Sequence, residues 1–277
     1  MVKNLQNAID SEAKKAGLKN LKTPVDLNFF NKYRIRCEGG GKPFYGEPIY
    51  PFYYHDIFKE LNYAVVGSWD TYQIPKIGTI LNFAKRRKNF EKKTEAPQGE
   101  VRIRCIDLSN WESELAIVYH LFNTSFKSMP EYESVTLEQF RVLYDDFKYL
   151  INPLISYIVE LDGVPVGFNI NYVDPLKILK SVEGKELNTL QKALLLGRLR
   201  LNRGPLLIAY VGSIKAPDGQ EVRGIQYKTS QRLWKWAIMN EKVLVCYQSE
   251  DSPSRRSWDT NPRKVYAKYF LYGKNLE

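Results

Sequence analysis

The chain has 277 residues, with 41 Lys or Arg against 31 Asp or Glu, so its formal net charge is +10. Hydrophobic residues make up 44% of the chain, enough for a packed core, and this excludes general disorder. No apolar run reaches the ~18 residues of a membrane-spanning helix. The first residues lack the apolar stretch of a secretory signal, and we therefore expect a cytoplasmic protein.

The cysteine and histidine content limits the possible chemistry. Cys37, Cys105 and Cys246 are too few and too scattered for a disulfide framework or a zinc knuckle. His55 and His120 are the only histidines, which excludes a histidine-rich metal site, and no metal is expected. The positive charge indicates an anionic partner: a nucleic acid, a membrane surface or a phosphorylated cofactor.

The first part of the chain predicts few regular elements. Apolar residues at helical spacing from Leu5 to Ala16 predict a helix that ends at Gly17. An extended segment (21–29), an aromatic- and proline-rich loop (43–54) and a strand (64–74) follow. A basic run with a following Pro and Gly predicts a linker over 85–100, which divides a partial N-terminal segment (1–84) from a domain over 101–277.

The second part alternates strands and helices. The turn Asp162-Gly163 between two apolar runs predicts a β-hairpin. The order predicts an α/β fold, a mixed sheet flanked by helices. In chain order the predicted elements are a strand (101–106), two helices (112–122, 137–149), two hairpin strands (154–161, 164–172), a helical region (185–203), a strand (206–214), a polar loop (215–223), a helix (224–240) and two strands (243–247, 265–272).

The strand, loop and helix over 206–247 form the most informative unit. A polar loop that enters a helix leaves backbone N–H groups unpaired, and with the helix dipole these groups favour a phosphate or pyrophosphate. Gly219 and Gly224 allow close backbone approach, and Arg223 supplies a positive charge. The alternative interpretation is an ordinary loop.

The order of elements over 101–277 resembles the GNAT (N-acetyltransferase) superfamily. In that family a loop of pattern Arg/Gln-x-x-Gly-x-Gly/Ala holds the pyrophosphate of acetyl-CoA, and the fourth and fifth strands diverge to admit the pantetheine arm. By this resemblance the cofactor-binding residues are Val211, Gly212, Ser213, Gln220, Arg223, Gly224, Ile225 and Gln226.

The resemblance extends to larger two-part GNAT-like proteins. The hairpin at Asp162-Gly163 and the Tyr-rich last strand are similar to theirs, and residues 1–76 are similar to a truncated first half. Two positions depart from the loop pattern: Gln226 stands where Gly or Ala is usual, and Glu221 takes the first position when the motif is placed on Gly224.

The resemblance implies an acyl-CoA-dependent N-acyltransferase that moves an acyl group to an amine of a small molecule or peptide. Such a reaction needs a base and an acid that protonates the leaving thiolate. Tyr266 is the predicted acid and Glu250 the predicted base. Further candidates are Tyr269 and Tyr272 on the last strand and the acidic residues Glu131, Glu133 and Asp251.

Two other functions stay open from the sequence. One is a GNAT-fold protein that binds acyl-CoA or another ligand and has lost catalysis, which the irregular loop would explain. The other is a nucleic-acid-associated module, which the net charge and the basic clusters over 85–93 and 198–203 favour.

Overall fold

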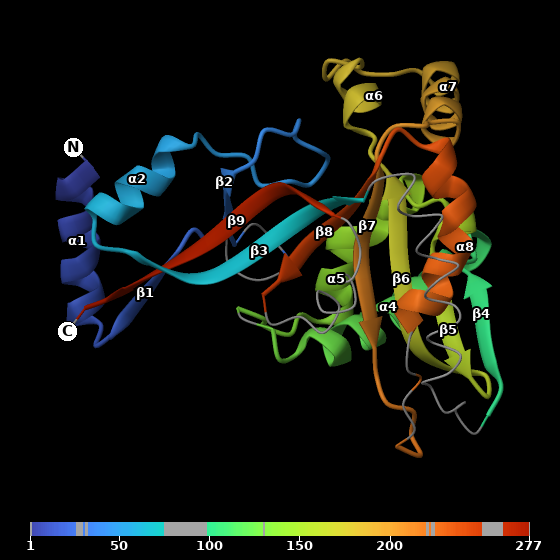
Figure 1. The fold of residues 1–277 in the computed structure, drawn as a ribbon, viewed down its shortest axis with the longest axis horizontal. Helices are drawn as coiled ribbons and strands as arrows, with labels where there is room; N and C mark the ends of the chain where they lie inside the picture. The colour runs from blue at the N-terminus through green and yellow to red at the C-terminus, as the bar shows by residue number, and fades with distance from the viewer. Residues whose placement is uncertain are drawn as a thin grey trace.

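The computed structural model describes residues 2–25, 30, 33–74, 99–129, 131–219, 222, 225–250 and 263–276. Within these residues a 9-stranded mixed sheet runs in the order β1-β9-β3-β8-β7-β6-β5-β4, and β2 also pairs with β9 (Figure 1). The strands are β1 (Asn20–Thr23), β2 (Ile35–Glu38), β3 (Ala64–Ile74), β4 (Val101–Cys105), β5 (Tyr157–Leu161), β6 (Val164–Val173), β7 (Leu206–Ser213), β8 (Val243–Ser249) and β9 (Lys264–Asn275).

Helices flank this sheet, which confirms the predicted fold class. They are α1 (Val2–Lys15), α2 (Tyr53–Glu60), α4 (Trp111–Phe126), α5 (Leu137–Tyr144), α6 (Leu176–Lys180), α7 (Thr189–Arg200) and α8 (Ile225–Met239). Short 3-10 turns are η1 (Leu108–Asn110), η2 (Asp145–Tyr149) and η3 (Pro153–Ile155). No described helix is long and apolar enough to cross a membrane.

Strands β4 to β7 form an antiparallel series, and β7 then pairs with β8 in parallel. The predicted hairpin is confirmed between β5 and β6. Asp162 and Gly163 have φ values of 49° and 80°, the positive values that a tight two-residue hairpin turn requires. A crossover through α8 is needed for the parallel pair, because parallel strands cannot be joined by a tight turn.

The N-terminal segment is part of the same sheet. β3 lies between β8 and β9 and is antiparallel to both, and β1 and β2 pair with the two halves of β9. In Figure 1, β3 and β9 extend together from the main sheet toward α1 and α2. Residues 1–84 therefore contribute strands to the sheet of the second part. The predicted linker over 85–100 lies almost wholly outside the described residues.

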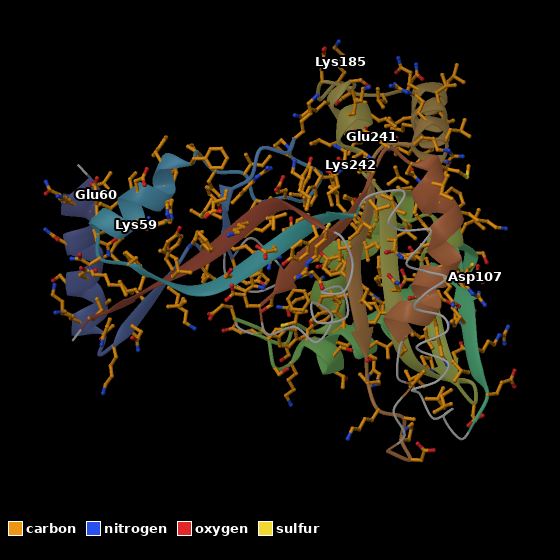
Figure 2. All side chains as sticks on the ribbon, viewed as in Figure 1. Lys59, Glu60, Asp107, Lys185, Glu241 and Lys242 are labelled. Carbon is orange, nitrogen blue, oxygen red and sulfur yellow. The ribbon has the colours of Figure 1, made fainter. Side chains whose placement is uncertain are left out.

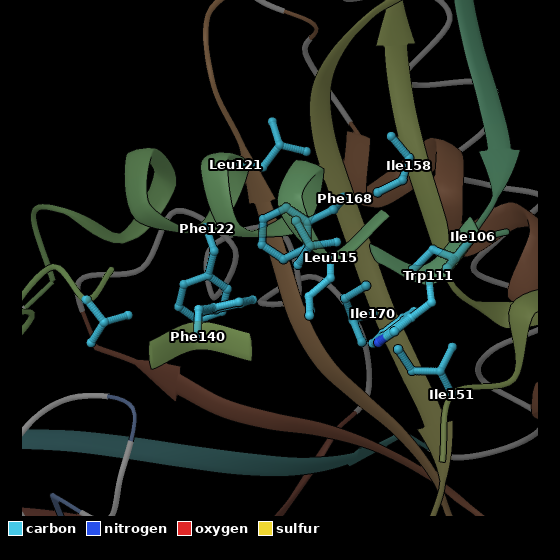
Figure 3. Close-up of a cluster of buried hydrophobic side chains, with 12 residues drawn as sticks. Ile106, Trp111, Leu115, Leu121, Phe122, Phe140, Ile151, Ile158, Phe168 and Ile170 are labelled. Atoms are coloured by element: carbon cyan, nitrogen blue, oxygen red, sulfur yellow. The ribbon is translucent and has the colours of Figure 1, made fainter. Parts of the chain in front are cut away.

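Two layers of side chains bury the faces of the sheet. On one face α8 packs over a cluster that includes Leu206, Ile208, Leu233, Val243 and Val245. On the other face α4 and α5 cover an aromatic cluster, which Figure 3 shows around Phe122, Phe140 and Phe168. The loop between β2 and α2 covers the adjoining part of this second face, through Phe44 against β8 and β9.

The helix predicted before Gly17 is confirmed as α1, in which Leu5 and Ile9 are 64% and 43% exposed and the buried Gln6 amide donates to the Tyr63 hydroxyl at 3.0 Å. Two other local predictions differ from the structure. The helix predicted over 137–149 ends at Tyr144 and continues as η2. The strand predicted from residue 154 begins after η3.

Candidate functional site

The parallel pair β7–β8 opens partway along its length. Its ladder contains three consecutive residue pairs, which end at Ile208–Val245. Beyond this pair β7 continues to Ser213 against β6, and β8 continues to Ser249 against β3. The two strands therefore diverge inside the sheet, and among the described residues no strand pairs with the exposed edge of β7.

Each strand carries a bulge directly after the last shared pair. On β7 the extra residue is Ala209, and on β8 Cys246 and Tyr247 together oppose Thr71 of β3. Tyr247 has a φ of 52°, and its N–H donates to Thr71 Oγ1 at 3.3 Å. Bulges bend the strand that contains them, and a positive φ is uncommon outside glycine. The two bulges therefore bend β7 and β8 away from each other directly after the Ile208–Val245 pair.

The guanidinium of Arg34 lies among aromatic rings at this divergence. Its Cζ is 4.0 Å from the ring centroid of Tyr247 on β8, 4.5 Å from that of Tyr33 and 5.2 Å from that of Trp69 on β3. Burial raises the pKa of Tyr210 on β7 and of Tyr247, and the charge of Arg34 opposes that rise in both. Its positive charge therefore acts on both diverging strands.

The guanidinium of Arg34 retains N–H donors for a ligand. Its Nη1 donates to the Tyr33 hydroxyl at 2.5 Å, and within the described part of the chain it forms no ion pair with a carboxylate. A guanidinium presents five N–H donors in a planar fork that matches a carboxylate or phosphate. A half-buried guanidinium with aromatic faces around it and no carboxylate partner is suited to receive an anion.

A buried ion pair holds the neighbouring loop in place. Arg36 Nη1 lies 3.1 Å from both carboxylate oxygens of Glu47, whose side chain is fully buried. The Tyr269 hydroxyl donates to Glu47 Oε1 at 2.5 Å. Burial raises the pKa of Glu47, and the bonds from Tyr269 and Arg36 oppose this rise. The pair fixes β2, and so Arg34, against β9.

Glycines make the close approach of this loop possible. Arg36 Nη2 donates to the carbonyls of Gly39 and Gly41 at 3.0 and 2.7 Å. Gly39 has a φ of 109°, and a Cβ there would lie 2.3 Å from the carbonyl oxygen of Tyr266. A side chain at this position would force the loop away from β9.

Tyr210 is the described phenol on the diverging part of β7. Its ring packs against Phe122 of α4 at 5.6 Å between centroids. Burial raises the pKa of Tyr210 and of Tyr144 on α5, so both phenols hold their protons at neutral pH. Tyr210 can therefore donate a proton.

The predicted cofactor residues fall partly outside the described chain. Gln220, Arg223 and Gly224 lie outside it, as does the side chain of Gln226. Val211, Gly212 and Ser213 lie on β7 beyond its last pair with β8. Ile225 is the first residue of α8, is 4% exposed and packs against Gly167 of β6.

A buried polar contact fixes the start of α8 over the sheet. Asn169 of β6 donates through Nδ2 to Thr229 Oγ1 at 2.7 Å, and Thr229 Oγ1 donates to the Ile225 carbonyl at 2.8 Å. All three residues are buried. The first turn of α8 is therefore held close to β6 and β7.

The two predicted catalytic residues lie beside different parts of β3: Tyr266 of β9 is opposite Thr71 and Tyr72, and Glu250 is opposite Ser68. The Tyr266 hydroxyl donates to the Lys42 carbonyl at 2.6 Å, and its ring lies 5.5 Å from Lys242 Nζ, just before β8 begins. Glu250 is exposed directly after β8 ends, and its N–H donates to the Ser68 carbonyl at 3.4 Å. The structure shows no contact between the two side chains.

The other predicted candidates also have structural contacts. Tyr269 bonds Glu47, and Tyr272 is fully buried against Cys37 at 3.1 Å between hydroxyl and sulfur. Glu131 pairs with Lys22, whereas Asp251 lies outside the described residues. Within the described chain no three His, Cys, Asp or Glu side chains gather in a way that could hold a metal ion.

Sequence reasoning missed Arg34, Tyr210 and Tyr247 as a group. They come from β7, β8 and the segment before β2, and only the pairing of β3 between β8 and β9 brings these elements together. The one available signal was the alternation of aromatic and basic residues around Tyr33 and Arg34.

The comparisons with known proteins agree with this architecture. The chain is similar in fold to GNAT N-acetyltransferases. A GCN5-related N-acetyltransferase from Sphaerobacter thermophilus has a TM-score of 0.46 at 14% identity, over 88% of this chain and 59% of that one. A tandem GNAT protein from the clavulanic acid biosynthesis pathway has a TM-score of 0.43 at 9% identity, over 99% and 70%. Both TM-scores are below 0.5.

Sequence similarity to a curated protein covers only part of the chain. No protein-family model matches the chain. Protein YghO of Escherichia coli (strain K12) is 25% identical over 174 residues, which cover 59% of this chain and 41% of that protein. The matched region thus spans about two fifths of the length of this curated relative. A functionally unknown conserved protein from Staphylococcus epidermidis has a TM-score of 0.45 at 10% identity, over 99% of this chain and 81% of that one.

Proposed function

We propose that the chain is an acyl-CoA-dependent N-acyltransferase of the GNAT kind, acting in the cytoplasm on an amine that also carries a carboxylate. The observation that carries this proposal is the divergence of β7 from β8 after Ile208–Val245, with a bulge on each strand. Such an opening leaves backbone groups of β7 available to a linear amide-containing chain, as an added strand would use them.

The reaction is direct transfer at the divergence. The amine nitrogen of the acceptor attacks the thioester carbonyl carbon, a C–N bond forms, and the C–S bond breaks. The nitrogen loses a proton to a base, and the thiolate gains one from an acid. Glu250, exposed at the open end of β8, stays our proposed base.

Arg34 is the feature that favours a carboxylated acceptor. Its charge acts on both diverging strands, and its free donors face no carboxylate within the described residues. A carboxylate bound in two-point fashion by this guanidinium would hold the acceptor in one orientation. Amino acids and peptides with a free C-terminus have this chemistry.

Tyr210 fits the role of acid better than Tyr266. Its phenol is on the diverging part of β7, and burial raises its pKa so that it holds its proton. Tyr266 would first have to leave the bond to the Lys42 carbonyl. We therefore expect Tyr210→Phe to slow the chemical step.

The test is release of free thiol from acetyl-CoA in the presence of a panel of amines, with both tyrosine variants. Tyr210→Phe should lower kcat about a hundredfold, the lower end of what a positioned acid contributes. Tyr266→Phe should keep kcat within about twofold and lose about 1 kcal/mol of stability, the value of one hydrogen bond. A hundredfold loss in Tyr266→Phe alone would return the acid role to Tyr266. No thiol release with any amine, in a sample that binds acetyl-CoA, would leave a binding protein without catalysis.

A further inference from the structure

The chain between β6 and β7 forms a projecting helical hairpin. We define the α6–α7 hairpin as residues 176–203; in Figure 1 it stands clear of the sheet beyond the end of β6. Its base is held firmly: the Asn202 side-chain amide donates to the Asp174 carbonyl at 2.8 Å, and the Arg200 guanidinium donates to the carbonyls of Ile151 and Lys148. The hairpin is therefore an ordered projection.

A row of leucines on α7 faces away from the protein. Leu190, Leu194 and Leu201 are 69%, 61% and 75% exposed. At 3.6 residues per turn these positions share one side of the helix. Leu195 and Leu199 lie on the opposite side and are half-buried toward the body of the protein. One side of α7 thus packs toward the protein, and the leucine row is exposed to solvent.

The leucine row is not needed to start the helix. Asn188 and Gln191 form a capping box, in which the side chain of each accepts the backbone N–H of the other at 2.9 and 3.0 Å. This arrangement sets the first turn of α7 from local residues. Three exposed leucines on one side of a capped, projecting helix indicate a surface that a membrane or another molecule covers.

The charge around the row is strongly positive. The hairpin has seven basic residues against Glu183 and Glu186, a net charge of +5. All seven basic residues are at exposed positions, but the Arg200 guanidinium is bound to backbone carbonyls at the base of the hairpin. Lys185 pairs with Glu183 and lies at the end of the projection in Figure 2. The seven basic residues are Lys177, Lys180, Lys185, Lys192, Arg198, Arg200 and Arg203.

We propose that the α6–α7 hairpin binds the surface of an anionic lipid bilayer. Leu190, Leu194 and Leu201 enter the boundary between headgroups and acyl chains, and the basic side chains other than Arg200 contact lipid phosphates. Exposed leucines close to Lys and Arg side chains are the two kinds of group that the surface of an anionic bilayer can bind together. This inference does not depend on the proposed transferase activity.

Other occupants fit the surface less well. A second copy placed on the same row would bring two hairpins of charge +5 together, which costs association energy. A nucleic acid would neutralise the basic residues but would leave the leucines in water, since its backbone offers phosphates and sugars. A bilayer satisfies both the apolar and the charged side chains.

The test is co-sedimentation of the purified chain with vesicles. We would use pure phosphatidylcholine and an equal mixture of phosphatidylcholine and phosphatidylglycerol, each at low and high salt. The chain should bind the mixed vesicles and not the neutral ones, and added salt should weaken binding. The triple variant Leu190→Ser/Leu194→Ser/Leu201→Ser should reduce binding at least tenfold.

A matched variant controls for the loss of exposed leucine in general. Leu5→Ser replaces a leucine that is 64% exposed on α1, at the far side of the molecule from the hairpin (Figure 1), and should bind like the parent chain. Thermal unfolding of each variant checks that the fold is kept. Equal binding by the triple variant, or no binding to mixed vesicles at low salt, would overturn the proposal. So would a dimer, seen by light scattering, that the triple variant abolishes.

Discussion

Replacing Glu47 by Ala is expected to lower the free energy of unfolding by about 3–5 kcal/mol, because it leaves the buried Arg36 guanidinium without its carboxylate. The side chains of Arg36 and Glu47 are 6% and 0% exposed. The same change removes the acceptor of the Tyr269 hydroxyl and of the Phe44 N–H, which donates to Glu47 Oε2 at 3.2 Å. Typical domains have only about 5–15 kcal/mol in total, so the variant should be close to unfolding.

Chemical denaturation of two further variants shows which interaction causes the loss of stability in Glu47→Ala. Glu12→Ala removes an exposed pair with Lys15 and should cost less than about 1 kcal/mol. The double variant Arg36→Met/Glu47→Leu removes both charges and should recover most of the loss, since a buried cation without a partner is the main penalty. A loss within about 1 kcal/mol for Glu47→Ala would mean that water reaches Arg36 and that the pair does not hold the loop.

Replacing Arg34 by Met is expected to lower kcat/KM for a carboxylated amine about a hundredfold, which corresponds to about 3 kcal/mol for one charge-assisted contact. Methionine keeps an apolar side chain between the rings of Tyr33, Trp69 and Tyr247, so the packing of these rings is largely retained. The variant removes the positive charge and the donors that we assign to the acceptor's carboxylate.

Two comparisons make the Arg34 result specific. The parent chain should have a low kcat/KM for the same amine with its carboxylate converted to an amide. The Arg34→Met variant should lower that kcat/KM by less than about threefold, because the amide has no charge to pair with Arg34. Arg141→Met removes an exposed arginine that pairs with Glu112 at 3.1 Å and should leave kcat/KM unchanged. An equal loss for the acid and the amide would show that Arg34 supports the fold and does not select the acceptor.

Local elements were predictable from the sequence because short-range chemistry determines them. The turn at Asp162-Gly163 follows from the positive φ values that these residues tolerate, and the strand expected over 64–74 is β3. The position of β3 between β8 and β9 was not predictable, since it depends on pairing across nearly 200 residues.

The candidate site was less predictable from the sequence than the fold. Val211 to Ser213 were placed correctly on a strand, and a strand was expected over 243–247, where the structure has β8. Arg34 is one of many basic residues in the chain, and nothing in its local sequence distinguishes it from Arg36, which is buried in an ion pair. Only the fold shows that Arg36 is paired with a carboxylate and that Arg34 has no carboxylate partner among the described residues.

Isothermal calorimetry with acetyl-CoA tests the central claim, that the opening between β7 and β8 receives acyl-CoA. Plain CoA and a long-chain acyl-CoA would be titrated alongside. We predict saturable binding of acetyl-CoA with a Kd on the order of micromolar, equivalent to about 8 kcal/mol. No heat with any of the three ligands, in a folded sample, would contradict the account and leave the GNAT resemblance as one of architecture alone.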